Sequence, residues 1–307
     1  MKVLVVARCK DGRFAPFITE QVKALEELDV ECRFFPVNKS GIWGYLLHLV
    51  GLKRAISAFR PDLVHAHYGL SGLLANLQRQ VPVVTTYHGS DINDRKVRPM
   101  SRLSIHLSAF NIFVSRKILE IISPKDRSAL IPCGINLEDY PEMEKSQARL
   151  KMHLSATGKY VLFSGAFDNA VKNAPLAEEA VSRLKSVKLI ELKGYSRVEV
   201  ATLMHAADAM LMTSRTEGSP QVIKEALACG CPIVSVDVGD VKELTDGVSG
   251  CVMVGRDSVS IANALQLVLQ SGGRTEGRHV IMEKGLSNDV IARRILDIYQ
   301  RVRKRRR

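Results

Sequence analysis

The chain has 307 residues, 46% of them hydrophobic, which is enough for about two domain-sized cores and excludes a disordered chain. Its formal net charge of +12 indicates an anionic partner or surface, with nucleic acid, membrane lipid and phosphorylated metabolites all open. Six dispersed cysteines without a C-x-x-C pair exclude a disulfide scaffold and a paired-cysteine zinc site, and indicate reduced, mostly buried thiols.

The N-terminal sequence MKVLVVARCKDGR predicts neither a membrane span nor a secretory signal. Its apolar stretch is too short to cross a bilayer, it lacks a small-residue cleavage site, and no run of about 18 apolar residues follows. We therefore expect a cytoplasmic protein with an intact N-terminus.

Apolar segments in the N-terminal half predict strands, with helical patterns between many of them. The predicted strands are residues 2–7, 31–37, 62–67, 82–88, 111–115 and 129–133. The predicted helices include residues 17–28, 43–59 and 70–80. This alternation is typical of a parallel sheet with crossover helices.

A polar, charge-mixed segment then interrupts the pattern, and we place an interdomain connection near residues 134–140. A second series of predicted strands follows at residues 160–165, 187–194, 208–214, 232–237 and 250–254. We thus expect an α/β protein with an N-terminal domain over 1–138, a C-terminal domain over 139–286 and a terminal helix over 287–307.

The C-terminal segment predicts an amphipathic helix with a basic tail. Ile291, Ile295, Ile298 and Val302 recur at helical spacing, and basic residues fill the other face. Two interpretations stay open: a helix packed on the body with a solvated tip, or a contact with anionic lipid headgroups, where each base adds roughly 1 kcal/mol.

Several polar residues follow directly after predicted strands, where open parallel sheets bind their ligands. They are His88, Gly165 and the segment 216–219. Asp91 either caps the next helix, which we favour, or orients His88. His65 and His67 point to one side of a strand without an evident third metal ligand, and we interpret them as structural or acceptor-side residues.

The segment TEGSPQVIKEALACGCPIV, from residue 216 to 234, predicts a helix over 220–228. Ser219 is a typical N-cap and Pro220 suits the first helical position. Glu217 then lies in the preceding loop and Glu225 in the second turn. A helix start of this kind suits a phosphate, with the carboxylates available for sugar hydroxyls. Alternatively, Glu217 only complements the helix dipole and Glu225 is a solvated charge.

The segment SRTEGSPQVIKEALACGCPIVSVDVGDVKEL resembles the E-x7-E region of retaining glycosyltransferase family 4. TTYHGSD, LIPCGINLEDY and SGAFDNAVKN resemble other segments of that family in the expected order. The resemblance implies a GT-B fold, in which two Rossmann-like domains face each other across a cleft. The C-terminal domain then holds a nucleotide-sugar donor and the N-terminal domain mainly the acceptor.

The resemblance also implies roles for individual residues. Glu217, His88 and Lys172 are the catalytic candidates: Glu217 at the donor sugar, His88 at the donor–acceptor junction and Lys172 on the donor diphosphate. The implied donor-binding residues are Glu225 for the ribose, together with Gly218, Ser219, Pro220, Gln221, Gly165 and Gly12. The main-chain amides of this set line the sugar and phosphate end, except that Pro220 has no N–H.

The sequence departs from the family pattern at two places. Many members have an arginine where this chain has Ala166, and charge alone offers Arg8, Lys10, Arg13 or Arg215 as replacements. The loop after the first strand has Gly12 as its only glycine, where the family typically has a Gly-Gly pair.

The expected function is transfer of a sugar from a nucleotide-diphosphate sugar to a glycan or lipid-linked acceptor, with retention of configuration and without metal or other cofactor. The alternatives are a related sugar-nucleotide epimerase or sugar phosphorylase and, from another class, a basic nucleic-acid-binding protein. Aromatic residues make up only 6% of the chain and the tail has no interleaved aromatics, which disfavours nucleic acid. A peripheral contact with an anionic membrane through the tail remains one option.

Overall fold

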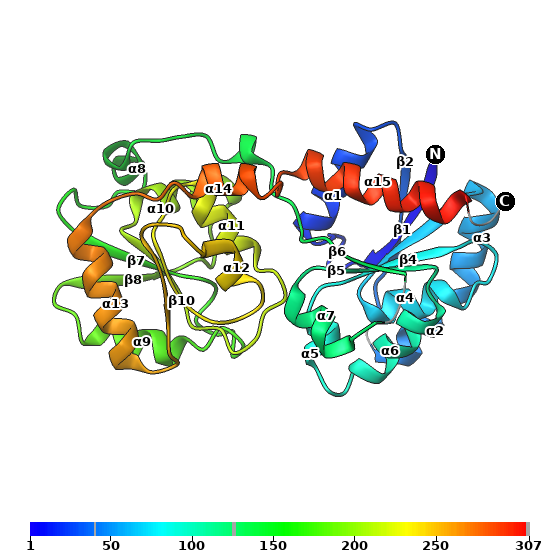
Figure 1. Cartoon of the computed structure of the whole chain (residues 1–307), viewed down its shortest axis with the longest axis horizontal. Helices are drawn as coiled ribbons and strands as arrows, with labels where there is room; N and C mark the ends of the chain where they lie inside the picture. The colour runs from blue at the N-terminus through cyan, green and yellow to red at the C-terminus, as the bar shows by residue number, and fades with distance from the viewer. Residues whose placement is uncertain (40, 125–126, 305–307) are drawn as a thin grey trace. The chain divides into compact units, whose positions relative to one another are not determined.

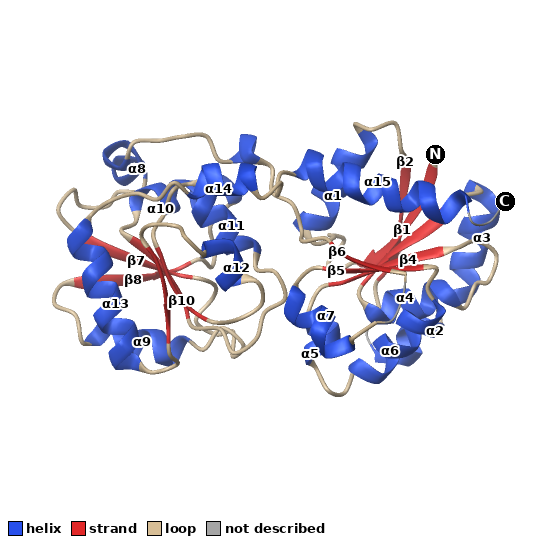
Figure 2. Cartoon of the chain, in the orientation of Figure 1, coloured by secondary structure: helices blue, strands red, loops and turns tan. Residues whose placement is uncertain are grey.

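The computed structural model describes residues 1–39, 41–124 and 127–304, and the chain divides into two compact units. The first unit comprises Met1–Gly134 and the C-terminal segment from Asn288, and the second comprises Ile135–Ser287. In each unit a parallel sheet is covered by helices on both faces (Figure 2). The alternation of strands and helices in the sequence therefore corresponds to two separate α/β units.

The sheet of the first unit has strand order β2-β1-β3-β4-β5-β6, with all pairs parallel. Its strands are β1 (Lys2–Arg8), β2 (Glu31–Val37), β3 (Leu63–His67), β4 (Val83–Tyr87), β5 (Phe110–Phe113) and β6 (Ser128–Leu130). Because the chain leaves β1 toward β2 on one side and returns to β3 on the other, β1 and β3 form the topological switch point, where ligand sites of such sheets lie.

The helices of the first unit pack on the two faces of this sheet. They are α1 (Pro16–Glu26), α2 (Gly41–Leu46), α3 (Leu49–Phe59), α4 (Gly69–Asn76), α5 (Ser90–Asn93), α6 (Arg98–Leu107), α7 (Arg116–Ile122) and α15 (Asn288–Lys304). Side chains alternate along β1: Val3 and Val5 share a core with α1 and α15, whereas Leu4 and Val6 share one with α3 and α4.

The prediction of one helix over residues 43–59 is wrong, because α2 ends at Leu46 and α3 begins at Leu49. The break has a local cause. The imidazole Nδ1 of His48 hydrogen-bonds the Gly44 carbonyl at 2.8 Å, which a continuous helix would offer to the His48 N–H. That N–H donates instead to the Tyr45 carbonyl, three residues back, at 3.0 Å.

Helix α15 belongs to the first unit. It runs beside α1 (Figure 1), and its apolar residues Ile291, Ile295, Ile298 and Val302 are buried in the core that α1 shares. The packed-helix interpretation therefore describes residues 288–304, and the apolar stripe is not available to a bilayer. The last three bases of the tail lie outside the described residues.

The sheet of the second unit has strand order β11-β10-β9-β7-β8, also parallel throughout. Its strands are β7 (Lys159–Phe163), β8 (Val187–Glu191), β9 (Ala209–Met212), β10 (Ile233–Val236) and β11 (Cys251–Val254). By the same argument β7 and β9 form its switch point.

The helices of the second unit also lie on both faces of the sheet. They are η1 (Leu137–Asp139), α8 (Lys145–Lys151), α9 (Ala174–Ser182), α10 (Arg197–Ala206), α11 (Gln221–Ala228), α12 (Val241–Thr245), α13 (Ser258–Ser271) and α14 (Gly277–Glu283). Val161 and Phe163 pack with α9 and α13, whereas Leu162 packs with α10 and α11. None of the helices in the described part of the chain combines the length and apolar character that a membrane crossing needs.

Candidate functional site

Lys172 and Glu217 meet at the switch point of the second unit. Lys172 lies in the loop after β7 and Glu217 in the loop after β9. Lys172 Nζ is 2.8 Å from Glu217 Oε1, and the two side chains are only 18% and 16% exposed. Because the pair is largely withdrawn from water, the two opposite charges compensate each other.

The loop that carries Lys172 is fixed to the end of β9. Thr213 Oγ1 donates to the Lys172 carbonyl at 2.9 Å, and the Arg215 N–H donates to the Val171 carbonyl at 2.8 Å. Gly165 contributes through its missing side chain, since a Cβ there would lie 2.8 Å from Lys172 Cγ. The stem of Lys172 therefore packs on the backbone at Gly165, which holds the ammonium group at the sheet edge.

The expected cap of the helix after Glu217 is wrong. Helix α11 begins at Gln221, and Pro220 occupies the N-cap position, where its side chain forms no capping hydrogen bond. The Ser219 hydroxyl donates instead to Asp240 Oδ2 at 2.5 Å. The start of α11 thus has no cap from its N-cap residue and lies next to Gly218 and Ser219, and a helix start attracts anions.

A buried lysine, which the sequence interpretation missed, supports this loop. Lys224 is fully buried, and its Nζ donates to Ser219 Oγ at 2.7 Å and to Gln221 Oε1 at 3.1 Å. Asp240 is also buried, and burial raises its pKa although the Lys224 charge acts in the opposite direction. Lys224 lies among Ile223, Ala226 and Leu227 on α11, and that apolar surrounding was the only signal in the sequence.

Close backbone contact brings Asp240 to this loop. Gly239 has φ +54°, and a Cβ at this position would lie 2.4 Å from the Gly218 carbonyl oxygen. A side chain at residue 239 would therefore push the two loops apart. The positions of Gly218 and Ser219 depend on this contact as well as on Lys224.

Glu225 is half-buried on α11 rather than a solvated helical charge. It lies near Tyr140, whose pKa is raised by burial and, to a smaller extent, by the Glu225 carboxylate. Arg197 donates from Nε to the Tyr140 hydroxyl at 3.3 Å. Glu225 therefore has a polar environment of its own, on the same helix α11.

Ala166, which stands where the family pattern has an arginine, lies in the loop after β7, and two arginines lie at the loop after the neighbouring strand β9. Arg215 donates from Nη2 to Asn173 Oδ1 at 3.3 Å. Arg256 donates from Nη1 to the Ser214 carbonyl at 2.6 Å and from Nη2 to the Arg215 carbonyl at 3.2 Å. Arg256 was not a candidate, since nothing in its sequence surroundings distinguishes it from a surface base.

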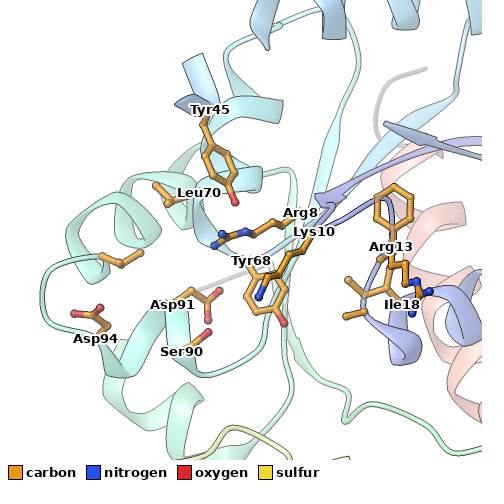
Figure 3. Close-up of a pocket in the computed structure, with 13 residues that line it drawn as sticks. Arg8, Lys10, Arg13, Ile18, Tyr45, Tyr68, Leu70, Ser90, Asp91 and Asp94 are labelled. Carbon is orange, nitrogen blue, oxygen red and sulfur yellow. The ribbon is translucent and has the colours of Figure 1, made fainter. Parts of the chain in front are cut away.

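The first unit contains a pocket of about 700 Å³ at its own switch point. Figure 3 shows the side chains that surround it. They come from the last residue of β1 and from segments after β1, β2, β3 and β4: Arg8, Lys10, Arg13, Phe14, Ala15, Ile18, Tyr45, Tyr68, Leu70, Ser90, Asp91, Asp94 and Val97. Gly12 lies between two of these cations, in the turn after β1.

The sequence of each unit matches a model of a glycosyltransferase family. Residues 2–139 match Glycosyltransferase Family 4, and residues 165–271 match Glycosyl transferases group 1. The chain belongs to glycosyltransferase family 4. These two matches agree with the division of the chain into two units.

Several curated proteins resemble this family 4 chain. The D-inositol 3-phosphate glycosyltransferase of Mycobacterium marinum is 27% identical over 281 residues, which are 74% of this chain and 60% of that protein. The putative teichuronic acid biosynthesis glycosyltransferase TuaC of Bacillus subtilis is 26% identical over 215 residues, 60% of this chain and 55% of that protein. The chain thus spans about 60% of the length of the first of these relatives.

Solved structures share the fold across nearly the whole chain. Sucrose-phosphate synthase from Thermosynechococcus elongatus has a TM-score of 0.85 at 17% identity, covering 98% of this chain and 99% of that chain. Anabaena Alr3699/HepE in complex with UDP has a TM-score of 0.76 at 16% identity, covering 97% and 99%. These similarities establish the fold, and the prediction of GT-B, with two Rossmann-like units, is confirmed.

His88 of the family 4 chain lies in a cluster of histidines in the first unit. His67 Nδ1 is 3.0 Å from His88 Nε2, and Cys133 Sγ is 3.6 Å from His88 Nδ1. His65 hydrogen-bonds the Tyr299 hydroxyl at 2.5 Å and Thr86 Oγ1 at 2.8 Å. Burial lowers the pKa of His65 to about 3 and that of His67 well below its usual range, so both rings are neutral.

The histidines are held by these neighbours, which agrees with a structural role for His65 and His67. Across the residues that the structure describes, no group of three or more His, Cys, Asp or Glu side chains is arranged to hold a metal ion. His88 is the member of the cluster that is half-exposed, at the end of β4.

Asp91 organises the backbone around His88. Its carboxylate accepts the N–H groups of Gly69, His88 and Gly89 at 2.9, 3.1 and 2.9 Å, and burial raises its pKa to about 6. Asp91 lies inside α5 (Ser90–Asn93) and binds the first N–H of α4, an earlier helix, so the prediction that it caps the helix that follows is wrong. It fixes the main chain at His88 through the backbone N–H.

Proposed function

We propose that the chain transfers a sugar from a nucleotide-diphosphate sugar to a hydroxyl group of a glycan or lipid-linked acceptor. The observation that carries this proposal is the Lys172–Glu217 pair at the β7/β9 switch point, beside the start of α11. A lysine and a helix start together suit a diphosphate. Membership of glycosyltransferase family 4 supports the proposal, and one solved structure of the same fold contains UDP-glucose.

In this proposal Lys172 leaves Glu217 and binds the donor diphosphate. As the bond between the sugar carbon and the diphosphate oxygen breaks, negative charge grows on the leaving group. Lys172 and the amides of Gly218, Ser219 and Gln221 stabilise that charge more in the transition state than in the ground state. The released Glu217 carboxylate then accepts hydrogen bonds from the donor sugar, and Glu225 accepts them from the ribose.

Retention of configuration requires the acceptor oxygen to form its bond on the face that the diphosphate leaves. A diphosphate oxygen then takes the acceptor proton, so no separate base is needed. By resemblance to the family, His88 contributes at the junction of donor and acceptor, and Gly165 and Gly12 allow close approach of the backbone. The cations Arg215 and Arg256 offer further compensation of charge, so the proposed reaction proceeds without a metal or other cofactor.

Calorimetric titration with UDP, followed by turnover of UDP-sugars, tests the donor site. Lys172→Ala is expected to lower turnover by about 2–4 kcal/mol of transition-state stabilisation, whereas Glu225→Ala is expected mainly to weaken UDP binding. Lys185→Ala, an exposed lysine of the same unit, is the matched control. Unchanged binding and turnover in both site variants would end the assignment.

A contact with anionic membranes through the C-terminal bases is a separate part of the proposal. Since the apolar face of α15 is buried, only the charges at its end are available. Deletion of residues 303–307 keeps the buried Val302 and is expected to reduce sedimentation with vesicles containing anionic lipid. Equal sedimentation of the shortened chain would favour a solvated tip.

A further inference from the structure

The pocket of the first unit contains three cations whose side chains have no ion-pair partner among the described residues. Within residues 1–39, 41–124 and 127–304, the side chains of Arg8, Lys10 and Arg13 form no hydrogen bond and no ion pair. All three side chains are exposed. Figure 3 shows Arg8 and Lys10 extending into the space above Tyr68 and Asp91. Their charges are therefore directed at a space large enough for a small ligand.

The backbone holds two of these cations opposite each other. Lys10 and Arg13 exchange two backbone hydrogen bonds of 2.9 Å across a two-residue turn, in which Asp11 and Gly12 have φ of 49° and 75°. Residues paired in this way project their side chains to the same side, and like charges there are destabilising. Asp11 also adopts the left-handed region without being glycine. Figure 3 shows the Lys10 ammonium turned toward Arg8 and Tyr68 and the Arg13 guanidinium lying near Ile18, so each adds positive charge to a different side of the pocket.

The acids of the pocket have other partners. The Asp91 carboxylate accepts three backbone N–H groups, from Gly69, His88 and Gly89. Asp94 Oδ1 accepts the N–H of Lys96 at 2.8 Å. Neither carboxylate forms an ion pair with Arg8 or Lys10 among the described residues. The open part of the pocket therefore keeps a positive field.

Tyr68 provides a flat surface in the same pocket. Its backbone has φ 72° and ψ 152°, an unfavourable conformation for a residue other than glycine. The ring lies 4.6 Å from the His88 ring, measured between centroids, and Leu70 lines the pocket beside it. Such aromatic and apolar groups pack against the apolar face of a sugar or polyol ring while polar groups orient it.

We propose that this pocket binds the acceptor, and that the acceptor is a polyol or sugar ring that carries a phosphate group. Arg8 and Lys10 bind the phosphate, Arg13 adds to the positive field, and Tyr68 packs against the ring. Arginine suits this task because its planar fork matches two phosphate oxygens. The proposal rests on the proposed transferase function and specifies its second substrate. The three cations lie at the β1/β3 switch point, which is where such a sheet binds a ligand.

Calorimetric titration of the intact chain, in the presence of UDP, tests the proposal with myo-inositol, myo-inositol 1-phosphate and inorganic phosphate as probes. The phosphate ester is expected to bind at least tenfold more tightly than myo-inositol. Arg8→Gln and Lys10→Gln are each expected to weaken its binding by about tenfold, as for loss of one charged hydrogen bond. Lys23→Gln, an exposed base of the same unit outside the pocket, is expected to change nothing.

The UDP titrations separate this proposal from the donor site. If Arg8→Gln and Lys10→Gln weaken UDP binding and leave the ester unaffected, these cations serve the donor and the acceptor proposal is wrong. The acceptor proposal is also overturned if the phosphate ester and myo-inositol bind equally tightly, or if neither the ester nor inorganic phosphate binds. If UDP does not bind to any form of the chain while the ester does, the proposed donor site fails and the phosphate pocket stands.

A last comparison identifies where the phosphorylated ring comes from. Vesicles containing phosphatidylinositol present the same ring on a lipid, with its phosphate as a diester, and phosphatidylcholine vesicles are the control. If the chain sediments with phosphatidylinositol vesicles, and sediments less in Arg8→Gln and Lys10→Gln, a lipid headgroup is supported as the acceptor. Tight binding of the soluble ester without vesicle binding supports a soluble acceptor. If Arg8→Gln and Lys10→Gln keep both ester binding and vesicle binding, the proposed pocket is contradicted.

Discussion

Lys224 Nζ donates a hydrogen bond to Ser219 Oγ at 2.7 Å, and the Ser219 hydroxyl donates in turn to Asp240 Oδ2 at 2.5 Å. A fully buried ammonium group thus connects the helix that carries Glu225 to the loop that carries Glu217. The spacing of the two glutamates is held by this connection as well as by α11 itself.

The first prediction concerns the stability of this connection. Lys224→Met keeps the volume of the side chain but leaves buried Asp240 without the nearby positive charge, so we expect a loss of about 3 kcal/mol in the free energy of unfolding. Urea denaturation measures it, with Lys185→Met as the exposed control. Adding Asp240→Asn to Lys224→Met should restore part of the loss. A change of less than about 1 kcal/mol in the single variant would contradict the role given to Lys224.

The second prediction separates the two roles of Glu217. In the unliganded site the Glu217 carboxylate pairs with Lys172, and its negative charge also repels an arriving diphosphate. Glu217→Gln is therefore expected to bind UDP a few-fold more tightly, by about 1 kcal/mol, because an electrostatic competitor is removed. Turnover should nevertheless fall by about tenfold or more, since the carboxylate at the donor sugar is lost. Weaker UDP binding in Glu217→Gln would speak against competition for Lys172.

The third prediction concerns the packing of Lys172 against Gly165. In Gly165→Ala the new methyl group would lie 2.8 Å from Lys172 Cγ and 3.1 Å from its Cδ, so the stem must move. We expect turnover to fall about tenfold, because small displacements of a charge-stabilising group are costly. Stability should change by less than about 1 kcal/mol, since the stem is flexible. Gly273→Ala, with no atom within 4 Å of the added Cβ, is the matched control.

The alternation of apolar segments was sufficient to predict both sheets, because buried parallel strands read as short apolar runs between amphipathic helices. The pairing of Lys172 with Glu217 was not predictable from spacing, since their loops meet only through the strand order β9-β7. Arg256, which follows β11, donates a hydrogen bond to the loop after β9. Resemblance to the family named Lys172 and Glu217 individually, without their contact.

Local polar chemistry explains the remaining differences. Ser219 followed by Pro220 is a strong helix-start pattern, yet the buried Asp240 and Lys224 take the Ser219 hydroxyl. His48 interrupts a helical pattern because its ring replaces its own N–H at the Gly44 carbonyl. In both cases a side chain forms a hydrogen bond that the sequence pattern does not reveal.

The fourth prediction concerns metal ions. Because Lys172 and the start of α11 supply positive charge in the proposed donor site, turnover of UDP-sugars is expected to be the same after dialysis against EDTA as before. The measurement compares initial rates with and without added Mg²⁺ or Mn²⁺. Loss of activity on chelation, restored by one of these ions, would mean that the diphosphate requires a metal.

The fifth prediction follows from the buried neutral histidine of the first unit. The unfolded chain takes up a proton on His65 below its ordinary pKa of 6.5, whereas the folded state holds it neutral down to about 3. The unfolded state therefore binds more protons in this window, and His65 lowers the free energy of unfolding as the pH falls, by up to about 1.4 kcal/mol per unit. His67, with its pKa also lowered, acts in the same direction, whereas Asp91, with its pKa raised to about 6, acts in the opposite one.

In His65→Gln, which keeps a polar side chain near Thr86 and Tyr299, the decline in the free energy of unfolding between pH 6.5 and pH 4 should be smaller by about 3 kcal/mol. Urea denaturation at a series of pH values measures this difference directly. Parallel curves for the two proteins over that range would show that His65 is protonated in the folded state, and that its contacts with Thr86 and Tyr299 do not require a neutral ring.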